Sequence, residues 1–363
     1  MTPPPGFYKT EKQLGMVCKL TKSLYGLKQA PRQWFSKFAD SLVTYGFIQI
    51  PHDHSLFTYN HNGEFLILLV YVDDVIITGT SIPRIDHVKA FIHDAFRIKD
   101  LGTLKYFLGL EVARSSKGIF INQRKYALDI LAETGLLACK PSSTPMDVKE
   151  KLALSTAEKI SDPTQYRKLV GKLVYLNVTR PDIAFDVHTL SQFLASPTTD
   201  HLQAAQRVLR FIKGAPGQGF FYPAKGSLVL EAFCDADWAS CPVTRRSTSE
   251  SEYRAMANTC CELVWLTALL RDLHITVHTP IALYCDNQSA SHIAKNPVFH
   301  ERTKHIELDC HLVRQHFTSG FISPRFIASS SQPADMFTKA LPADSLLRLS
   351  DKLGVTNFLH RQA

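Results

Sequence analysis

A pair of adjacent carboxylates between two apolar runs is the feature that most restricts the fold of this chain. The segment Glu64–Gly79, EFLILLVYVDDVIITG, places Asp73 and Asp74 between two runs of aliphatic and β-branched residues. Such runs favour strands, so we expect a hairpin with both acids at its tip. The dense apolar residues before the acids predict a first strand that is buried on both faces.

Two neighbouring carboxylates are costly beside a hydrophobic sheet, because like charges repel each other and lose hydration. A divalent cation removes that cost, and Mg²⁺ prefers carboxylate oxygens. The alternative is an ordinary Asp-Asp turn that faces water, since Asp is common in turns. The sequence YVDD between two long strands is more specific than DD alone and favours the metal interpretation.

Three segments in a fixed order point to a known family. They are CKLTKSLYGLKQAPRQW at Cys18–Trp34, YVDD at Tyr71–Asp74 and DLGTLKYFLGLEV at Asp100–Val112. These segments resemble the reverse transcriptase of copia-type retrotransposon polyproteins, whose palm carries the YVDD hairpin. The similarity extends from PPGF at residues 4–7 to FTKALP at residues 337–342.

The resemblance implies catalytic and metal-binding roles for Asp73 and Asp74, and a substrate-binding role for Tyr71. It also places Lys28 and Gln29, in a Gly-containing turn, near the incoming nucleotide and the template. A solvated loop is the alternative for these two residues. The implied partners are an RNA or DNA template-primer and deoxynucleoside triphosphates, and the implied cofactor is Mg²⁺ or Mn²⁺.

Composition agrees with this resemblance without proving it. The chain carries 41 Lys and Arg against 33 Asp and Glu, a net charge of +8, which favours a polyanionic partner. Eight cysteines show no CxxC pair or zinc-type spacing. We expect no signal peptide and no membrane span, and therefore a cytoplasmic or nuclear protein.

Besides the YVDD hairpin, the pattern between residues 30 and 214 predicts helices and a second hairpin. Helical spacing predicts one helix after Pro31, one from Ile85 to Phe96 and three between Tyr166 and Ile212. Residues 104–122 alternate between apolar and polar positions and predict a hairpin. Two Pro- or Gly-rich breaks, KPSSTPMD at 140–147 and GAPGQG at 214–219, mark expected boundaries. The basic residues in the helical region either contact a nucleic-acid backbone or are simply solvated: Arg180, Arg207, Arg210 and Lys213.

A second set of carboxylates lies beyond residue 226. Asp235 and Asp286 each follow an expected strand, over Leu228–Phe233 and Ile281–Cys285. Glu252 opens an expected helix, and Asp335 follows Pro333 at another helix start. The motifs CDAD, EYRA, CDNQSA and PADMFTK resemble ribonuclease H, which implies that these four carboxylates are catalytic and hold two metal ions.

Three residues of this set also have an alternative interpretation. Asp237 could be the first ligand instead of Asp235, while Glu252 and Asp335 could serve a helix dipole and a helix start. The segment HERTKHIELDCH at residues 300–311, including His305, has metal-binding residue types at helical spacing. We interpret it as the polar face of a surface helix.

Two departures from the family pattern predict impaired catalysis. The third carboxylate of the family's polymerase site lies upstream of PPGF, and neither Asp40 nor Asp53 has the strand context to replace it. Only fourteen residues, Trp238–Ser251, separate CDAD from Glu252. Two strands with their connections need about 16–25 residues, so we expect an internal deletion and leave open whether the four carboxylates converge.

These observations predict an α+β multidomain protein. It would comprise an incomplete polymerase palm with the YVDD hairpin, a helical connection and a shortened ribonuclease H-like α/β domain. The expected divisions are a palm and thumb fragment over 1–147, the connection over 148–225, the ribonuclease H-like domain over 226–345 and a tail over 346–363. The predicted function is that of an impaired retrotransposon reverse transcriptase fragment. The alternatives are a non-catalytic nucleic-acid-binding protein, ribonuclease H activity alone, or a non-functional pseudogene product.

Overall fold

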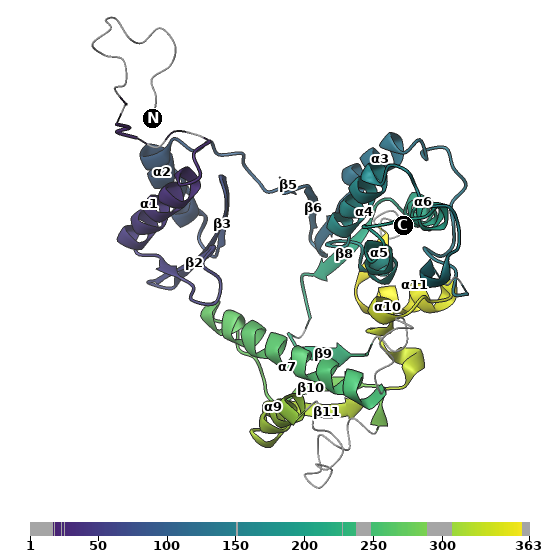
Figure 1. Ribbon diagram of the computed structural model, residues 1–363. Helices are drawn as coiled ribbons and strands as arrows, with labels where there is room; N and C mark the ends of the chain where they lie inside the picture. The colour runs from purple at the N-terminus through teal and green to yellow at the C-terminus, as the bar shows by residue number, and fades with distance from the viewer. Residues whose placement is uncertain are drawn as a thin grey trace, which may run out of the picture. The chain divides into compact units, whose positions relative to one another are not determined.

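The described residues of the protein form a mixed α+β structure with three sheets (Figure 1). Its structure is a computed structural model that describes residues 17, 19–22, 24, 26–149, 152–226, 228–236, 248–288 and 307–357. The chain divides into two compact units. The first contains residues 1–102 with 272–274, and the second contains residues 103–271 with 275–363.

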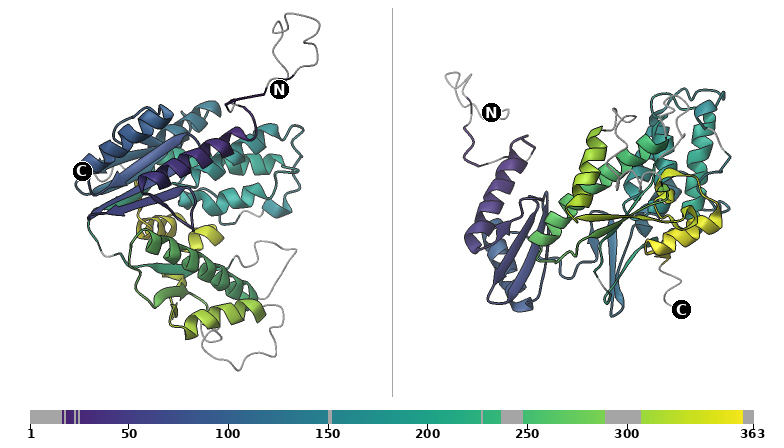
Figure 2. Two further views of the ribbon diagram at one scale, coloured as in Figure 1. Left: turned by 90° about the vertical axis from the view of Figure 1, so that its left-hand side faces the viewer. Right: turned by 90° about the horizontal axis from the view of Figure 1, so that it is seen from below.

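The first unit is built on an antiparallel sheet with the strand order β1-β2-β3-β4. Its strands are β1 (Ile48–Gln49), β2 (Leu56–His61), β3 (Glu64–Tyr71) and β4 (Asp74–Gly79). Helices α1 (Ala30–Tyr45) and α2 (Ile82–Phe96) pack on one face of this sheet (Figures 1 and 2). Both predicted helices and the predicted hairpin are therefore confirmed.

Local sequence explains where these helices begin and end. Pro31 occupies the first turn of α1, where a missing N–H costs no hydrogen bond, and Gly46 ends that helix with φ of 117°. Ser81 begins α2 by accepting a hydrogen bond from the Arg84 backbone N–H.

The prediction that the first strand of the YVDD hairpin is buried on both faces is wrong for this unit. In β3 only Leu66, Leu68 and Val70 are buried, and the residues between them are half-buried. The physical reason is that α1 and α2 cover the same face of the sheet, so only alternate side chains enter the core.

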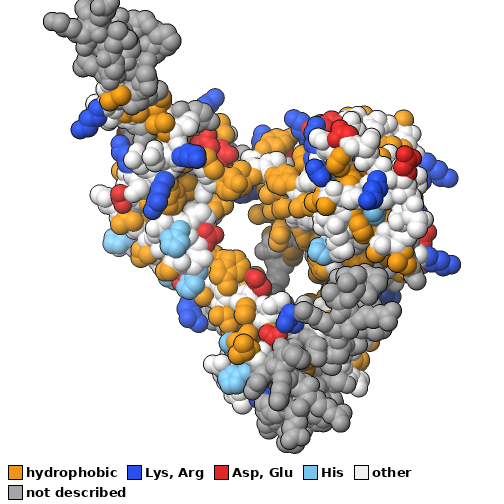
Figure 3. Space-filling model, viewed as in Figure 1, with side chains coloured by type: hydrophobic (Ala, Val, Ile, Leu, Met, Phe, Trp, Pro, Cys, Tyr) orange, Lys and Arg blue, Asp and Glu red, His pale blue; other side chains and the backbone are white. Residues whose placement is uncertain are grey.

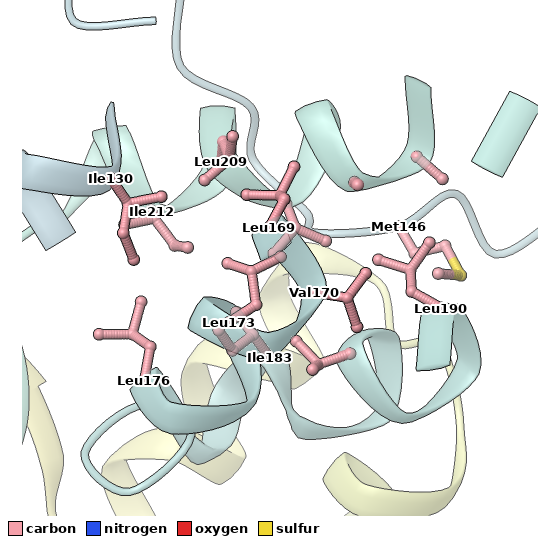
Figure 4. Packing of buried hydrophobic residues seen from close by; sticks show 14 of the residues in the cluster. Ile130, Met146, Leu169, Val170, Leu173, Leu176, Ile183, Leu190, Leu209 and Ile212 are labelled. Carbon is pink, nitrogen blue, oxygen red and sulfur yellow. The ribbon is translucent and has the colours of Figure 1, made fainter. Parts of the chain in front are cut away.

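The second unit contains the three helices predicted for the connection, which are α4 (Thr164–Leu176), α5 (Ala184–Ser191) and α6 (Thr199–Gly214). A further helix, α3 (Arg124–Glu133), precedes the predicted connection and was not predicted. Figure 4 shows how the apolar faces of these helices meet in one core, to which Met146 of the predicted linker also contributes. A capping box between Thr198 and His201 begins α6.

A five-stranded antiparallel sheet, ordered β12-β8-β7-β6-β5, lies beside these helices. Its strands are β5 (Tyr106–Phe107), β6 (Leu110–Ser115), β7 (Gly118–Asn122), β8 (Gln218–Pro223) and β12 (Val355–Asn357). The hairpin β6–β7 confirms the pairing predicted within residues 104–122. Gly219 allows β8 to approach β7, since a Cβ there would lie 2.2 Å from the Ile121 carbonyl oxygen.

This sheet places the divisions of the chain differently from the sequence prediction. We predicted a first domain ending at 147 and a tail from 346, but the first unit ends at residue 102. Strands β5–β7 join the second unit because β7 pairs with β8. The expected tail is also part of this unit, because α11 (Ala343–Lys352) buries Leu346 and Leu349, and β12 pairs with β8.

A third sheet, ordered β11-β10-β9, is parallel throughout. Its strands are β9 (Glu231–Cys234), β10 (Ile281–Cys285) and β11 (Ile322–Phe326). Helices α7 (Thr248–Asp272) and α9 (Glu307–Thr318) pack against one face of it (Figure 2), and the short helix α10 (Asp335–Thr338) follows β11. Residues 237–247, Asp237 and His305 lie outside the described residues.

Three of the basic residues expected either to contact nucleic acid or to be simply solvated make contacts inside the second unit. Arg180 is 1% exposed and donates from Nε and Nη2 to the Asp182 carboxylate, each at 2.8 Å. Arg207 donates to the Thr144 hydroxyl, and Arg210 donates to the Lys140 carbonyl oxygen. A phosphate contact is therefore wrong for Arg180, and the other two hold the Pro-rich linker against α6.

Within the described ranges, none of the helices combines the length and the hydropathy that crossing a membrane requires.

Candidate metal centre

Two of the predicted carboxylates lie next to each other at the carboxyl end of the parallel sheet. Asp235 directly follows β9 and Asp286 directly follows β10. The two strands are parallel, and Cys234 and Cys285 are partners in the register. The sheet therefore brings Asp235 and Asp286 side by side at the edge where parallel sheets commonly bind ligands.

The third carboxylate, Glu252, comes from the first turns of α7. It is 4% exposed, and its Oε2 accepts a hydrogen bond from the Cys285 thiol at 3.5 Å. Burial, together with the nearby charge of Asp235, raises the pKa of Glu252 to about 7.

Asp335, the fourth carboxylate, is the first residue of α10. The fully buried Gln332 connects this segment to β9 by donating from Nε2 to the Cys234 carbonyl oxygen at 3.0 Å. Its own Oε1 accepts a hydrogen bond from the Ala334 N–H. Gln332 thus fixes the start of α10 beside the strand that precedes Asp235.

The four predicted carboxylates lie together. Ligand atoms of Asp235, Asp286 and Asp335 are all within 4.8 Å of one another, and Glu252 and Asp286 meet the same limit with Cys285. Asp286 belongs to both groups and connects them. The short segment before Glu252 therefore does not keep the carboxylates apart in this structure.

A lysine side chain partly neutralises this centre. Lys339 Nζ lies 2.9 Å from Asp335 Oδ1 and 3.2 Å from Asp235 Oδ2, and the Thr338 hydroxyl also donates to Asp235. Although burial lowers the pKa of Lys339, its contacts with the two carboxylates raise that pKa overall. Burial raises the pKa of Asp335, and Lys339 offsets part of this effect. One ammonium group among four carboxylates leaves a strongly acidic site that suits divalent cations.

Sequence reasoning missed three residues of this centre. Lys339 was visible as the residue one helical turn after Asp335, and Cys285 as the residue before Asp286. Gln332 had no signal in the sequence, because its partner is a backbone carbonyl about one hundred residues away.

The YVDD residues form the tip of the hairpin in the first unit. Tyr71 pairs with Asp74, so Val72 and Asp73 make a two-residue turn, with Val72 at φ of 54°. Tyr71, Val72 and both aspartates are exposed. Among the described residues, no third His, Cys, Asp or Glu joins Asp73 and Asp74 in a metal-binding group.

The other predicted substrate-binding residues lie on a different element of this unit. Lys28 and Gln29 form an exposed turn that leads into α1, and Gln29 occupies its N-cap position without a side-chain cap. This placement fits both a solvated loop and a surface that contacts substrate.

Comparisons with known proteins find retrotransposon polyproteins that are similar over almost the whole chain. Residues 1–148 match the model of the family described as Reverse transcriptase (RNA-dependent DNA polymerase). Over 98% of its length the chain is 40% identical to the Retrovirus-related Pol polyprotein from transposon RE1 of Arabidopsis thaliana. Over the same share it is 32% identical to that from transposon TNT 1-94 of Nicotiana tabacum. No solved structure matches the chain.

The chain spans about a quarter of the length of these polyproteins, 26% and 29% respectively. It also covers 95% of an uncharacterized mitochondrial protein of Arabidopsis thaliana, at 38% identity over 56% of this chain. The aligned stretch of the RE1 polyprotein, 382 residues, is longer than the 363 residues of this chain. That relative therefore contains residues without a counterpart here.

Proposed function

We propose that this chain, which belongs to the copia-type retrotransposon Pol polyproteins and includes part of their reverse transcriptase region, cleaves the RNA strand of RNA–DNA hybrids. The centre would be Asp235, Glu252, Asp286 and Asp335. The observation that carries this proposal is the convergence of these four carboxylates, from four separate elements, at the carboxyl end of one parallel sheet.

The residues present fit a pair of Mg²⁺ or Mn²⁺ ions. Asp235, Glu252, Asp286 and Asp335 would hold the ions, since these four carboxylates belong to the two ligand groups and Asp286 belongs to both groups. The Lys339 ammonium, placed between two of these carboxylates, supports the view that the site accepts cations. When bound, the ions activate a water molecule and stabilise the leaving oxygen of a phosphodiester.

The surrounding fold supports a ribonuclease H-like domain with a shortened sheet. A strand ending in Asp235, a helix carrying Glu252 and a parallel strand ending in Asp286 follow one another in the chain. The residues that the RE1 polyprotein has in excess support an internal deletion in this chain. We place it near residues 238–251, where the sequence is too short for two further strands.

Hybrid cleavage tests this proposal. The purified chain, with Mg²⁺ or Mn²⁺, should cleave a labelled RNA strand paired with DNA, and Asp286→Asn should reduce the rate by about 10²-fold or more. Asp351→Asn, at an exposed position of α11, is the matched control and should keep the parent rate. Equal rates for the parent and Asp286→Asn would disprove the assignment of the centre.

A second activity, DNA synthesis on an RNA template, is favoured by the family match over residues 1–148. In this proposal Asp73 and Asp74 hold metal ions, and Tyr71, Lys28 and Gln29 contact the template or the nucleotide. Two-metal phosphoryl transfer needs both ions clamped, and the described residues supply only this one pair of carboxylates at the hairpin. We therefore propose that the 363-residue chain by itself is impaired as a polymerase.

Primer extension on an RNA template with Mg²⁺ measures that impairment. Little or no product is expected from the chain alone, and Asp73→Asn should change the yield little. Robust synthesis that disappears in Asp73→Asn would show that the impairment proposal is wrong.

Nucleic-acid binding without chemistry is the remaining outcome of these assays. Figure 3 shows Lys and Arg side chains spread among acidic and polar ones on the visible face, not gathered in one stripe. Binding that weakens steeply with salt and is indifferent to Asp73→Asn, Asp74→Asn and Asp286→Asn would favour a non-catalytic binding protein. Failure both to bind and to cleave would favour a pseudogene product.

A further inference from the structure

Two buried thiols lie directly behind the carboxylate centre. Cys234 and Cys285 are the last residues of β9 and β10 and are partners in the parallel register. They are 3% and 1% exposed, and the Cys234 thiol donates to the Tyr284 carbonyl oxygen at 3.5 Å. Each thiol directly precedes a carboxylate of the centre, Asp235 or Asp286.

One of these thiols reaches the carboxylates themselves. Cys285 Sγ donates to Glu252 Oε2 at 3.5 Å and accepts a hydrogen bond from the Asn287 N–H at 3.4 Å. The ligand atoms of Glu252, Cys285 and Asp286 all lie within 4.8 Å of one another. The centre therefore contains a second ligand set, with one sulfur and two oxygens, beside the all-oxygen set of Asp235, Asp286 and Asp335.

These two sets prefer different cations. Mg²⁺ and Mn²⁺ favour oxygen ligands, whereas thiolate ligands select Zn²⁺ and similar soft ions. Three protein ligands with one open position are common for zinc, and tetrahedral zinc distances hold ligand atoms roughly 3.5 Å apart. The three ligand atoms lie within 4.8 Å of one another, and the Cys285 Sγ to Glu252 Oε2 distance is already 3.5 Å. Metal binding would release the thiol proton, as it does at other cysteine sites.

We propose that Glu252, Cys285 and Asp286 bind a thiophilic divalent cation, of the Zn²⁺ or Cd²⁺ class, and that this cation excludes the ions of the carboxylate centre. The exclusion follows because the thiophilic cation would occupy Asp286 and Glu252. Both residues are also proposed ligands of the two ions of the nuclease centre. The exclusion rests on the proposed function, but the binding of the cation does not. Thiophilic ions would therefore inhibit hybrid cleavage, and the Cys285 thiol would make the centre prefer them.

Cadmium titration of the full chain tests the binding, with Cd²⁺ alone as the probe. Thiolate–cadmium absorption in the ultraviolet should show a tight equivalent that Cys285→Ser abolishes. Cys310→Ser is the matched control, because Cys310 is buried in the same hydrophobic cluster but belongs to neither ligand set. Cys261→Ser should also keep the tight equivalent, since this exposed thiol lies outside both sets.

Glu252→Gln provides a second route if Cys285→Ser fails to fold. It keeps the thiol but removes a ligand, so cadmium affinity should fall at least tenfold. Three results would overturn the proposed site. The first is cadmium absorption that survives in Cys285→Ser, and the second is absorption that is lost equally in Cys310→Ser. The third is an unchanged cadmium affinity in Glu252→Gln.

Displacement of Mn²⁺ tests the exclusion and separates it from the proposed function. One equivalent of Cd²⁺ should release protein-bound Mn²⁺, measured by electron paramagnetic resonance, from the parent chain but not from Cys285→Ser. Equal release from both proteins would contradict the role of the thiol. Asp335→Asn should lose hybrid cleavage yet keep the tight cadmium equivalent. The two proposals can therefore fail separately, because cleavage tests the nuclease and cadmium binding tests the thiophilic site.

Discussion

At the scale of single residues, the side chain that most changes the picture of the carboxylate centre is Lys339. It lies one helical turn after Asp335, and its ammonium contacts the carboxylates of both Asp335 and Asp235. An internal cation in this position stabilises the carboxylates before any metal arrives. It also competes with a metal ion for the same oxygens.

Replacing Lys339 by Met should therefore strengthen binding of divalent cations. We expect the Mn²⁺ affinity of Lys339→Met to rise by about tenfold, equivalent to roughly 1.4 kcal/mol, because no ammonium must be displaced. Calorimetric titration with Mn²⁺ measures the change. Lys352→Met is the control, since Lys352 contacts the Ser331 carbonyl oxygen and neither carboxylate; an equal or weaker affinity in Lys339→Met would contradict the competition.

At the scale of an element, the YVDD hairpin combines a predictable shape with a turn that β-branched residues rarely adopt. The strands β3 and β4 pair from Leu66–Gly79 to Tyr71–Asp74, which leaves only Val72 and Asp73 in the turn. Val72 has φ of 54° and is 64% exposed. A β-branched residue in the left-handed region is strained, and such strain often accompanies functional sites.

Glycine at this position should relieve the strain. Because Val72→Gly and Val72→Ala both remove the exposed branched side chain, their difference isolates the cost of a Cβ at positive φ. We expect the Gly variant to be more stable than the Ala variant by about 1 kcal/mol, measured by chemical denaturation of the first unit.

The matched control is an exposed valine in a helix. Val43, in α1, is 53% exposed, and there Gly should be less stable than Ala by about 1 kcal/mol. The same ranking of Gly and Ala at both positions would show that the turn at Val72 is unstrained.

At the scale of the whole molecule, the second unit joins segments that the sequence separates. Residues from 106 to 122, from 218 to 223 and from 355 to 357 form one sheet, and the helices α3–α6 share one core. Within that helical core lies Asp186, which is 3% exposed and whose Oδ1 has no hydrogen-bond partner among the described residues. Burial raises the pKa of Asp186 to about 8; the charge of Asp182 adds to this effect and Arg207 opposes it.

This buried acid should make the stability of the second unit depend on pH. Asp186 keeps its proton in the folded state up to about pH 8 but loses it near pH 3.8 in the unfolded state. The unfolded state therefore binds fewer protons in this range, and stability falls as pH rises, by up to about 1.4 kcal/mol per pH unit.

The substitution Asp186→Asn should remove this dependence. Its free energy of unfolding, relative to that of the parent, should increase from pH 5 to pH 8. Asp351→Asn, on the surface of α11, should leave the pH dependence unchanged. A parallel pH dependence in the parent and Asp186→Asn would show that Asp186 is already ionised in the folded chain.

The sequence by itself determined what depends on local pattern. Apolar periodicity, Pro31, Gly46 and the paired aspartates were enough to place α1, the YVDD hairpin and the helices of the connection, because helices and hairpins form between residues close in the chain. Family motifs identified all four carboxylates that converge.

Only the tertiary structure decided which distant segments meet. Strand β12 belongs to a sheet whose first strand begins at residue 106, and Arg180 forms a buried ion pair. Lys339 and Cys285 lie in the carboxylate centre. Strand pairing and side-chain burial are set by packing between elements far apart in the sequence, and no short segment carries that information. This is also why the predicted boundary at residue 147 and the predicted tail differ from the compact units that form.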